Sequence, residues 1–142
     1  MAEQRWIWST DHLIPSRAGA GRRLLQELLE QLKRQHWVQH DIFSVQLAVE
    51  EALVNAIKHG NRLDHAKQVH IACRVAPDLL RVEITDQGRG FDLAAVPNPT
   101  DPEHLESPRG RGIMLMRSFM SRVQYNDLGN CVVLEKVRGG HE

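Results

Sequence analysis

Apolar side chains recur every three or four positions in three segments of the chain, which is the spacing of one face of an α-helix. Leucines in this pattern predict an amphipathic helix over Arg17–Gln35. A second helix is predicted to begin with Asp41 as its N-cap and to continue past Ala56 to a stop signal at Gly60–Asn61. The same spacing predicts a third helix over Gly112–Arg122.

Five other segments have the length and side-chain types of β-strands. They are Arg5–Thr10, Gln68–Val75, Leu79–Thr85, Arg122–Asn126 and Cys131–Val137. Short turn sequences separate the second strand from the third and the fourth from the fifth, which favours antiparallel pairing. The chain is therefore predicted to be an α+β protein, a two-layer sandwich whose mixed, mostly antiparallel sheet carries about three helices on one face.

Composition limits the broad class. A chain of 142 residues with 42% hydrophobic and 25% charged residues is typical of one globular domain, residues 1–142. Eighteen basic residues balance eighteen acidic ones, which disfavours direct nucleic-acid binding. No apolar run is long enough for a membrane span and the N-terminus lacks a signal-peptide core, so we expect a cytoplasmic protein. Cys73 and Cys131 are expected to be small buried side chains rather than a disulfide.

The predicted second helix carries polar chemistry beside its apolar stripe. Glu51 and Asn55 lie four residues apart, which places them on one helix face, and Lys58 lies near the same face. A carboxylate can accept a proton, an amide oxygen suits Mg²⁺, and a lysine suits phosphate. Taken alone, such a row is more typical of a solvated helix face.

Two glycine-rich segments follow. Asp86–Phe91, DQGRGF, comes directly after a predicted strand, and Pro108–Ile113, PRGRGI, comes just before a predicted helix whose first N–H groups would attract phosphate. Each alone is typical of an ordinary turn. The proline-rich stretch 97–111 is too long and polar for a simple connection, which favours a lid over a site.

The order and spacing of these segments resemble the GHKL ATP-binding superfamily, which includes gyrase and the histidine kinases. Residues 50–61 match its N box, residues 86–91 its G1 box and residues 110–113 its G2 box. Within the superfamily the chain is most similar to the small bacterial anti-sigma-factor serine kinases. The resemblance spans about residues 42–137 and implies the Bergerat ATP-binding fold, with ATP and Mg²⁺ as cofactors.

The resemblance also implies roles for individual side chains. Glu51 matches the general base and Asn55 the Mg²⁺ ligand, whereas Glu50 is one position out of register. Lys58 matches a lysine that contacts phosphate. Asp86 matches the carboxylate that recognises the adenine amino group.

The remaining matches concern glycines and two less secure positions. The glycines that would underlie the nucleotide and its phosphates are Gly88, Gly90, Gly110 and Gly112. Many relatives carry threonine after the glycine of the last hairpin, where this chain has Asn130, which can hydrogen-bond in its place. No basic residue of the lid aligns firmly with a phosphate contact, and Arg109 is the first candidate, with Arg111 the second.

By the same resemblance, the protein is expected to be a serine/threonine kinase that phosphorylates a small STAS-type antagonist and holds a sigma factor inactive, as a homodimer. Two alternatives stay open. The chain can be a non-catalytic ATP-binding module that sequesters a protein partner. It can also be a detached histidine-kinase-type catalytic domain with a separate phosphoacceptor.

Overall fold

A computed structural model describes residues 5–89 and 108–139, with the side chains of residues 108–110 excepted. Its sheet has five strands in the order β1-β2-β3-β5-β4, and every neighbouring pair is antiparallel. The strands are β1 Trp8–Pro15, β2 Gln68–Val75, β3 Leu79–Thr85, β4 Arg122–Tyr125 and β5 Cys131–Val137. β1 and β4 are therefore the two edges of this sheet.

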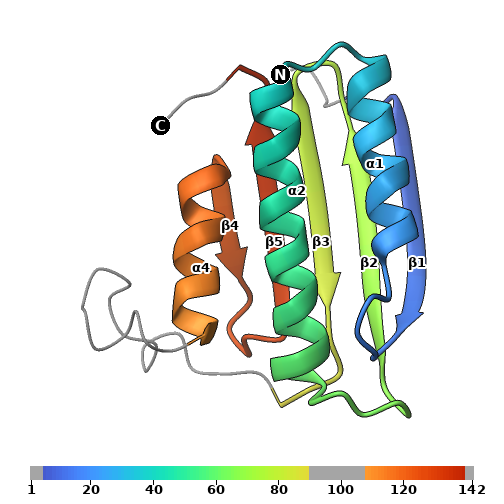
Figure 1. The fold of residues 1–142 in the computed structure, drawn as a ribbon, viewed down its shortest axis with the longest axis vertical. Coiled ribbons are helices and arrows are strands. Elements are labelled where there is room, and N and C mark those ends of the chain that lie inside the picture. Colours follow the sequence, from blue (N-terminus) through green and yellow to red (C-terminus); the bar gives the residue numbers. More distant parts are fainter. Residues whose placement is uncertain (1–4, 90–107, 140–142) are drawn as a thin grey trace.

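The helices form a second layer on one face of the sheet (Figure 1). They are α1 Arg22–Arg34, α2 Gln39–Val54 and α4 Pro108–Phe119. A π-helical segment, η1 Asn55–Gly60, continues directly from α2. The central helix α2 lies between α1 and α4 in front of the sheet, so both flanks of α2 face another helix. The predicted α+β sandwich with three helices on one face is confirmed.

Alternation along the strands explains how the two layers meet. On β3, Leu80, Val82 and Ile84 are buried, and the residues between them are only half-buried. Leu134 of β5 and Val49 of α2 are also fully buried in the same cluster. One hydrophobic core thus fixes α2 against the central strands, and α2 carries the predicted N box.

Several predicted boundaries are wrong because local backbone conformation overrides the apolar pattern. α1 begins at Arg22 rather than Arg17, since Gly19 and Gly21 adopt left-handed φ angles of 82° and 88° that interrupt a helix. The first strand begins at Trp8 and extends to Pro15, well beyond the predicted end at Thr10. No helix in the described ranges is both long and apolar enough to cross a membrane.

Asp41 is not the N-cap of α2. The helix begins at Gln39, so Asp41 lies in its first turn, where its side chain is completely buried. Asp41 Oδ2 accepts a hydrogen bond from the backbone N–H of Gly139 at 2.8 Å, and Lys136 Nζ lies 4.0 Å from Oδ1. The carboxylate therefore binds the end of β5 to α2 instead of capping a helix.

The cysteines are separate, as predicted. Cys73 is buried in the core and Cys131 is half-buried, and both are free thiols. Burial raises the pKa of Cys73 to about 12, so this thiol stays protonated at neutral pH. Desolvation also raises the pKa of Cys131, which lies beside Glu83 and Thr85. Neither cysteine has the environment of a reactive thiolate.

Candidate functional site

The N-box side chains lie where α2 widens into η1. At the end of η1 the backbone N–H of the next residue, Asn61, donates to the carbonyl of Ala56, five residues back, at 2.8 Å. Such π-helical segments are rare and are found often at functional sites. Glu51, on the last turns of α2, is half-buried, and Asn55, the first residue of η1, is only 3% exposed.

Gly112 of α4 packs directly against these two side chains. A Cβ atom on Gly112 would lie 2.8 Å from Glu51 Oε2 and 3.3 Å from Asn55 Nδ2. The absence of a side chain at residue 112 therefore allows α4 to approach the N-box face of α2. The structure thus brings together two motifs that lie about 60 residues apart in the sequence.

The amide of Asn55 is buried. Neither its Oδ1 nor its Nδ2 has a partner among the described residues. A buried polar group that lacks a partner carries a desolvation penalty of about 1–3 kcal/mol. Such a group is an expected feature of a site that a ligand completes.

A cleft of about 270 Å³ opens beside these residues. Its charged lining combines Glu51 with two cations, Lys58 of η1 and Arg111 of α4. Both cations have exposed side chains, so they can move toward a bound anion. The cleft is thus lined by the N box on one side and by the G2 segment on the other.

Asp86 lies in a second, more tightly packed part of the site. Its side chain is 6% exposed, and its Oδ1 accepts the backbone N–H of Gly88 at 2.8 Å. A Cβ on Gly60 would lie 2.3 Å from Asp86 Oδ2, and a Cβ on Gly88 would lie 2.1 Å from the carbonyl oxygen of Gly60. The end of η1 and the turn after β3 therefore interlock through two glycines. Gly60 was predicted only as a helix stop, although its place at the end of the N box was a usable signal.

A hollow of about 10 Å³ lies between Asp86 and the core. This is close to the smallest volume that holds a water molecule, and far too small for a purine base. Its polar lining is formed by Asn55, Asp86, Tyr125 and Asn130. The carbonyl of Asn130 accepts the backbone N–H of Asp86 at 2.9 Å, whereas its side-chain Oδ1 accepts Asn126 Nδ2 at 2.8 Å.

The prediction that the G2 glycines precede the helix is wrong. α4 begins at Pro108, so Gly110 and Gly112 lie within its first five residues. The first four N–H groups of a helix lack acceptors within the helix and can bind an anion. Because α4 begins at Pro108, its anion-binding end lies before Gly112 and not at it. The side chain of Arg109, the residue Gly90 and lid residues 97–107 lie outside the described part of the chain.

Gly112→Ala is expected to impair the site without unfolding the protein. Alanine favours a helix interior over glycine by about 0.5–1 kcal/mol, so α4 itself should not lose stability. The new methyl group would displace the Glu51 carboxylate, 2.8 Å away. Thermal unfolding should shift by no more than a few degrees, while the rate of any reaction that depends on the placement of Glu51 should fall at least about tenfold. Unchanged activity in a stable variant would contradict this packing.

The chain belongs to a known family of nucleotide-binding domains. The family model described as the histidine kinase-like ATPase domain matches residues 14–136, which is most of the chain. A serine-protein kinase RsbW from Bacillus licheniformis is 33% identical over 103 residues, covering 68% of this chain and 64% of that protein. An anti-sigma F factor from Clostridium perfringens is 29% identical over 102 residues, covering 68% of this chain and 72% of that protein. The resemblance inferred from the three boxes is confirmed.

A solved structure shows the same fold. The chain matches the RsbU and RsbW domains of a Mycobacterium tuberculosis protein with a TM-score of 0.62 at 16% identity, over 92% of this chain and 31% of that one. At this identity the likeness concerns the fold alone. The chain spans only 58%, 64% and 66% of the length of three curated relatives that it matches.

Proposed function

We propose that this protein is an ATP-dependent serine/threonine kinase that acts as an anti-sigma factor by phosphorylating a small STAS-type antagonist. The observation that carries the proposal is the convergence beneath Gly112 of Glu51 and the buried amide of Asn55, which has no hydrogen-bond partner in the described part of the chain. The names of the relatives, serine-protein kinase and anti-sigma F factor, support the same activity. We further propose that residues 1–142 act as one ATP-binding domain.

The residues present fit a magnesium-bound nucleotide. Mg²⁺ prefers oxygen ligands and is usually held by few protein groups together with substrate phosphates. Asn55 Oδ1 is such an oxygen, buried and without another partner among the described residues. When bound, Mg²⁺ would supply neutralisation of the triphosphate charge. Lys58, on the rim of the same cleft, would add a further positive charge at the phosphates.

Asp86 is proposed to recognise the adenine amino group. Its carboxylate is held by Gly88 N–H and shaped by Gly60, so its direction is fixed before a base arrives. The water-sized hollow beside it supports a water-mediated contact from Asn130, which replaces the threonine of many relatives. Gly90 is proposed to lie beneath the nucleotide, and Gly110 and Arg109 are proposed to contact the phosphates.

Glu51 is proposed to act as general base. It would accept the proton of the acceptor hydroxyl as that oxygen forms a bond to the γ-phosphorus. The bond from the γ-phosphorus to the β,γ-bridging oxygen breaks at the same centre, and ADP leaves. A half-buried carboxylate on the wall of an open cleft has both the access and the restricted motion that this role requires.

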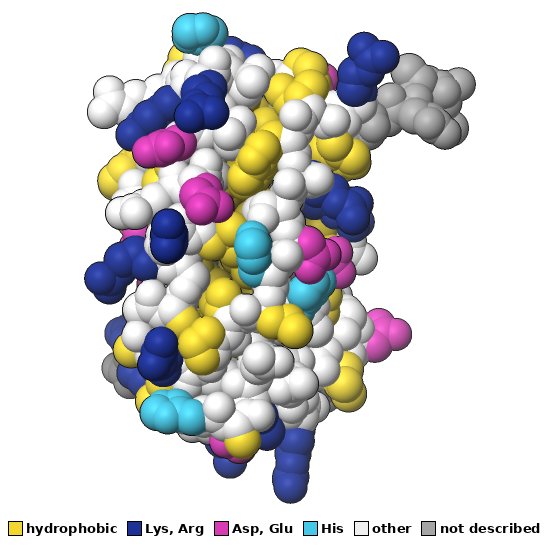
Figure 2. Space-filling model, turned by 90° about the vertical axis from the view of Figure 1, so that its right-hand side faces the viewer, with side chains coloured by type: hydrophobic (Ala, Val, Ile, Leu, Met, Phe, Trp, Pro, Cys, Tyr) yellow, Lys and Arg dark blue, Asp and Glu magenta, His cyan; other side chains and the backbone are white. Residues whose placement is uncertain are grey.

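The sigma factor, the STAS-type antagonist, the homodimer and the cytoplasmic location are parts of this proposal. Edge strand β1 supports association with another chain, because β2 is its only neighbour in the described sheet. Ile7 and Leu13 are 42% and 62% exposed along this edge. Figure 2 shows the β1 and α1 side of the molecule, with hydrophobic side chains exposed among charged ones. A sigma factor acts inside the cell, which sets the proposed location.

Calorimetric titration with ATP tests the nucleotide site. Wild-type protein should bind ATP more tightly with Mg²⁺ than without it. Asn55→Ala should lose the Mg²⁺-dependent part, and Asp86→Ala should weaken binding at least about tenfold with or without Mg²⁺. Well-folded wild-type protein that binds no ATP would overturn the proposal and leave a pure protein-interaction role.

Two alternatives are outcomes of a second assay. The match to the histidine kinase-like ATPase family is the reason to test for a detached histidine-kinase-type domain. Incubation with radiolabelled ATP and a candidate STAS-type protein should yield an acid-stable phosphoserine or phosphothreonine. An acid-labile phosphohistidine would support the histidine-kinase reading. ATP binding without any transfer would support a non-catalytic module that sequesters its partner.

A further inference from the structure

Asn61 joins four segments through one buried side chain. It directly follows η1 and is 1% exposed. Its Oδ1 accepts the backbone N–H of Gln87 at 2.7 Å. Its Nδ2 donates to Ser16 Oγ at 2.6 Å and to the carbonyl of Gln68 at 3.0 Å. One carboxamide thus connects the end of η1, the end of β1, the start of β2 and the turn after β3.

The bond to Gln87 positions the turn that carries Asp86. Gln87 is the next residue, and its own Oε1 accepts the backbone N–H of Gln68 at 2.7 Å. On the other side, the Asp86 N–H is held by the carbonyl of Asn130. The backbone that carries the Asp86 carboxylate is therefore held by hydrogen bonds on both sides, and Asn61 supplies one of them. Removing its amide would leave Ser16 Oγ and the Gln87 N–H without these partners.

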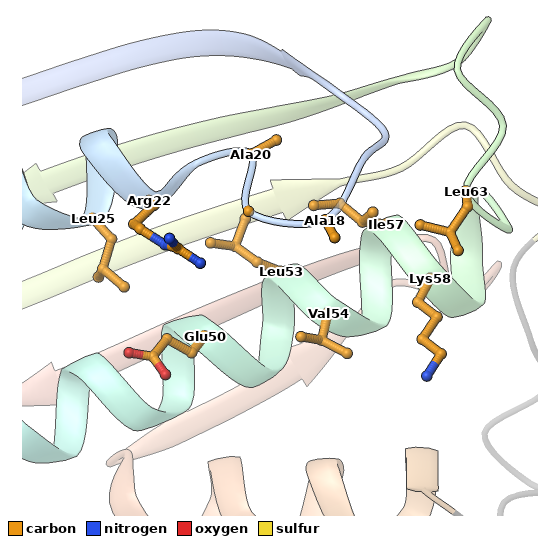
Figure 3. A pocket seen from close by; sticks show the side chains of 11 residues that line it. Ala18, Ala20, Arg22, Leu25, Glu50, Leu53, Val54, Ile57, Lys58 and Leu63 are labelled. Carbon is orange, nitrogen blue, oxygen red and sulfur yellow. The ribbon is translucent and has the colours of Figure 1, made fainter.

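The bond to Ser16 leads to a different cavity. Ser16 is fully buried, and the turn that follows it, residues 17–21, contributes Ala18, Gly19 and Ala20 to the wall of a 570 Å³ pocket. Figure 3 shows Ala18 of this turn beside Leu53 and Ile57, whereas the side chain of Lys58 points away from the turn. This pocket is lined from the α1 side of α2 and the cleft of Glu51 from the α4 side, and the two linings share Val54 and Lys58. Asn61 therefore links the Asp86 turn to the wall of a second cavity.

We propose that Asn61 is a positioning residue that holds the Asp86 turn for adenine recognition and couples nucleotide binding to the turn at residues 17–21. This inference rests on the proposed nucleotide site. The physical basis is a loss of conformational entropy that the sites share. Once ATP fixes the Asp86 turn, the side-chain amide of Asn61 is fixed as well, and the motion of Ser16 at the end of β1 is restricted with it. Coupling of this kind is reciprocal, so a partner that orders residues 17–21 would also tighten nucleotide binding.

Three variants separate the two halves of the proposal. Asn61→Ala removes all three bonds, and its dissociation constant for MgATP should rise about tenfold or more, the effect of losing a buried hydrogen bond. Asn61→Asp keeps an acceptor for the Gln87 N–H but places a buried carboxylate oxygen against the Gln68 carbonyl, so it should not restore the affinity. Ser16→Ala cuts only the connection to residues 17–21, so its affinity should stay within about threefold of wild type.

Hydrogen exchange on the full chain, with and without MgATP, supplies the second readout. In wild type, MgATP should protect the amides of both 86–89 and 17–21. In Ser16→Ala, protection should persist at 86–89 and disappear at 17–21. Folded Asn61→Ala with wild-type affinity, or Ser16→Ala that keeps protection at 17–21, would overturn the inference while leaving the kinase proposal intact. Wild-type protein that binds no ATP would overturn both.

Discussion

Replacing Glu51 with glutamine is expected to lower phosphoryl transfer by about 10²–10⁴-fold, the usual contribution of a general base. Glutamine keeps the shape of the side chain but cannot accept the hydroxyl proton. Because the proposed contacts to adenine and Mg²⁺ come from Asp86 and Asn55, the affinity for MgATP should change by no more than about threefold. Single-turnover transfer to the acceptor protein, with calorimetry on the same sample, measures both quantities.

Glu50 provides the matched control. It is the preceding residue on the same helix, it is exposed, and it accepts a hydrogen bond from Gln46 Nε2 at 3.1 Å. It lines the pocket on the α1 side of α2, away from the cleft of Glu51. Glu50→Gln should therefore transfer phosphate at close to the wild-type rate. Equal losses in both variants, or none in Glu51→Gln, would remove Glu51 from the chemistry.

Gly88→Ala should strongly weaken nucleotide binding. Its Cβ would fall 2.1 Å from the carbonyl oxygen of Gly60 and 2.9 Å from Asp86 Oδ1. The first contact is with backbone, which cannot rotate aside as a flexible side chain can, so the turn must separate from η1. We expect at least about a hundredfold loss of ATP affinity and a loss of about 1–3 kcal/mol in the free energy of unfolding.

Arg89→Ala is the comparison for that substitution. Arg89 is the next residue in the turn and its side chain is exposed. Urea denaturation and calorimetry should give near wild-type values for Arg89→Ala and low values for Gly88→Ala. If Gly88→Ala bound ATP normally, the interlocked arrangement of Gly60, Asp86 and Gly88 would not be required for binding.

Strand and helix types were predictable because the periods of apolar residues differ between them. Leu79–Thr85 and Cys131–Val137 were predicted with their observed bounds, since alternating burial and flanking turns define both strands. Helix ends were harder, because they depend on groups far away in the chain. Asp41 has the side chain of an N-cap, yet its hydrogen bond goes to Gly139, 98 residues later.

The candidate site was predicted in its parts but not in its geometry. Glu51, Asn55 and Asp86 could be named from their motifs. Gly112 could be named too, but not its position inside α4 or its contact with Glu51, since both depend on how α4 packs against α2. Asn61 offered only the signal of a helix stop, because its three hydrogen-bond partners lie 7, 26 and 45 residues away.

By itself, the sequence of this protein determined the order of its helices and strands, its layered class and the three boxes that place it among histidine kinase-like ATPase domains. These are local properties, set by side-chain periodicity and by glycines at short spacings. Only the tertiary structure decided that Gly112 meets Glu51 and Asn55, that Gly60 shapes the setting of Asp86, and that Asn61 joins the turn after β3 to Ser16. The physical reason is that close packing and buried hydrogen bonds select among partners that are distant in the chain.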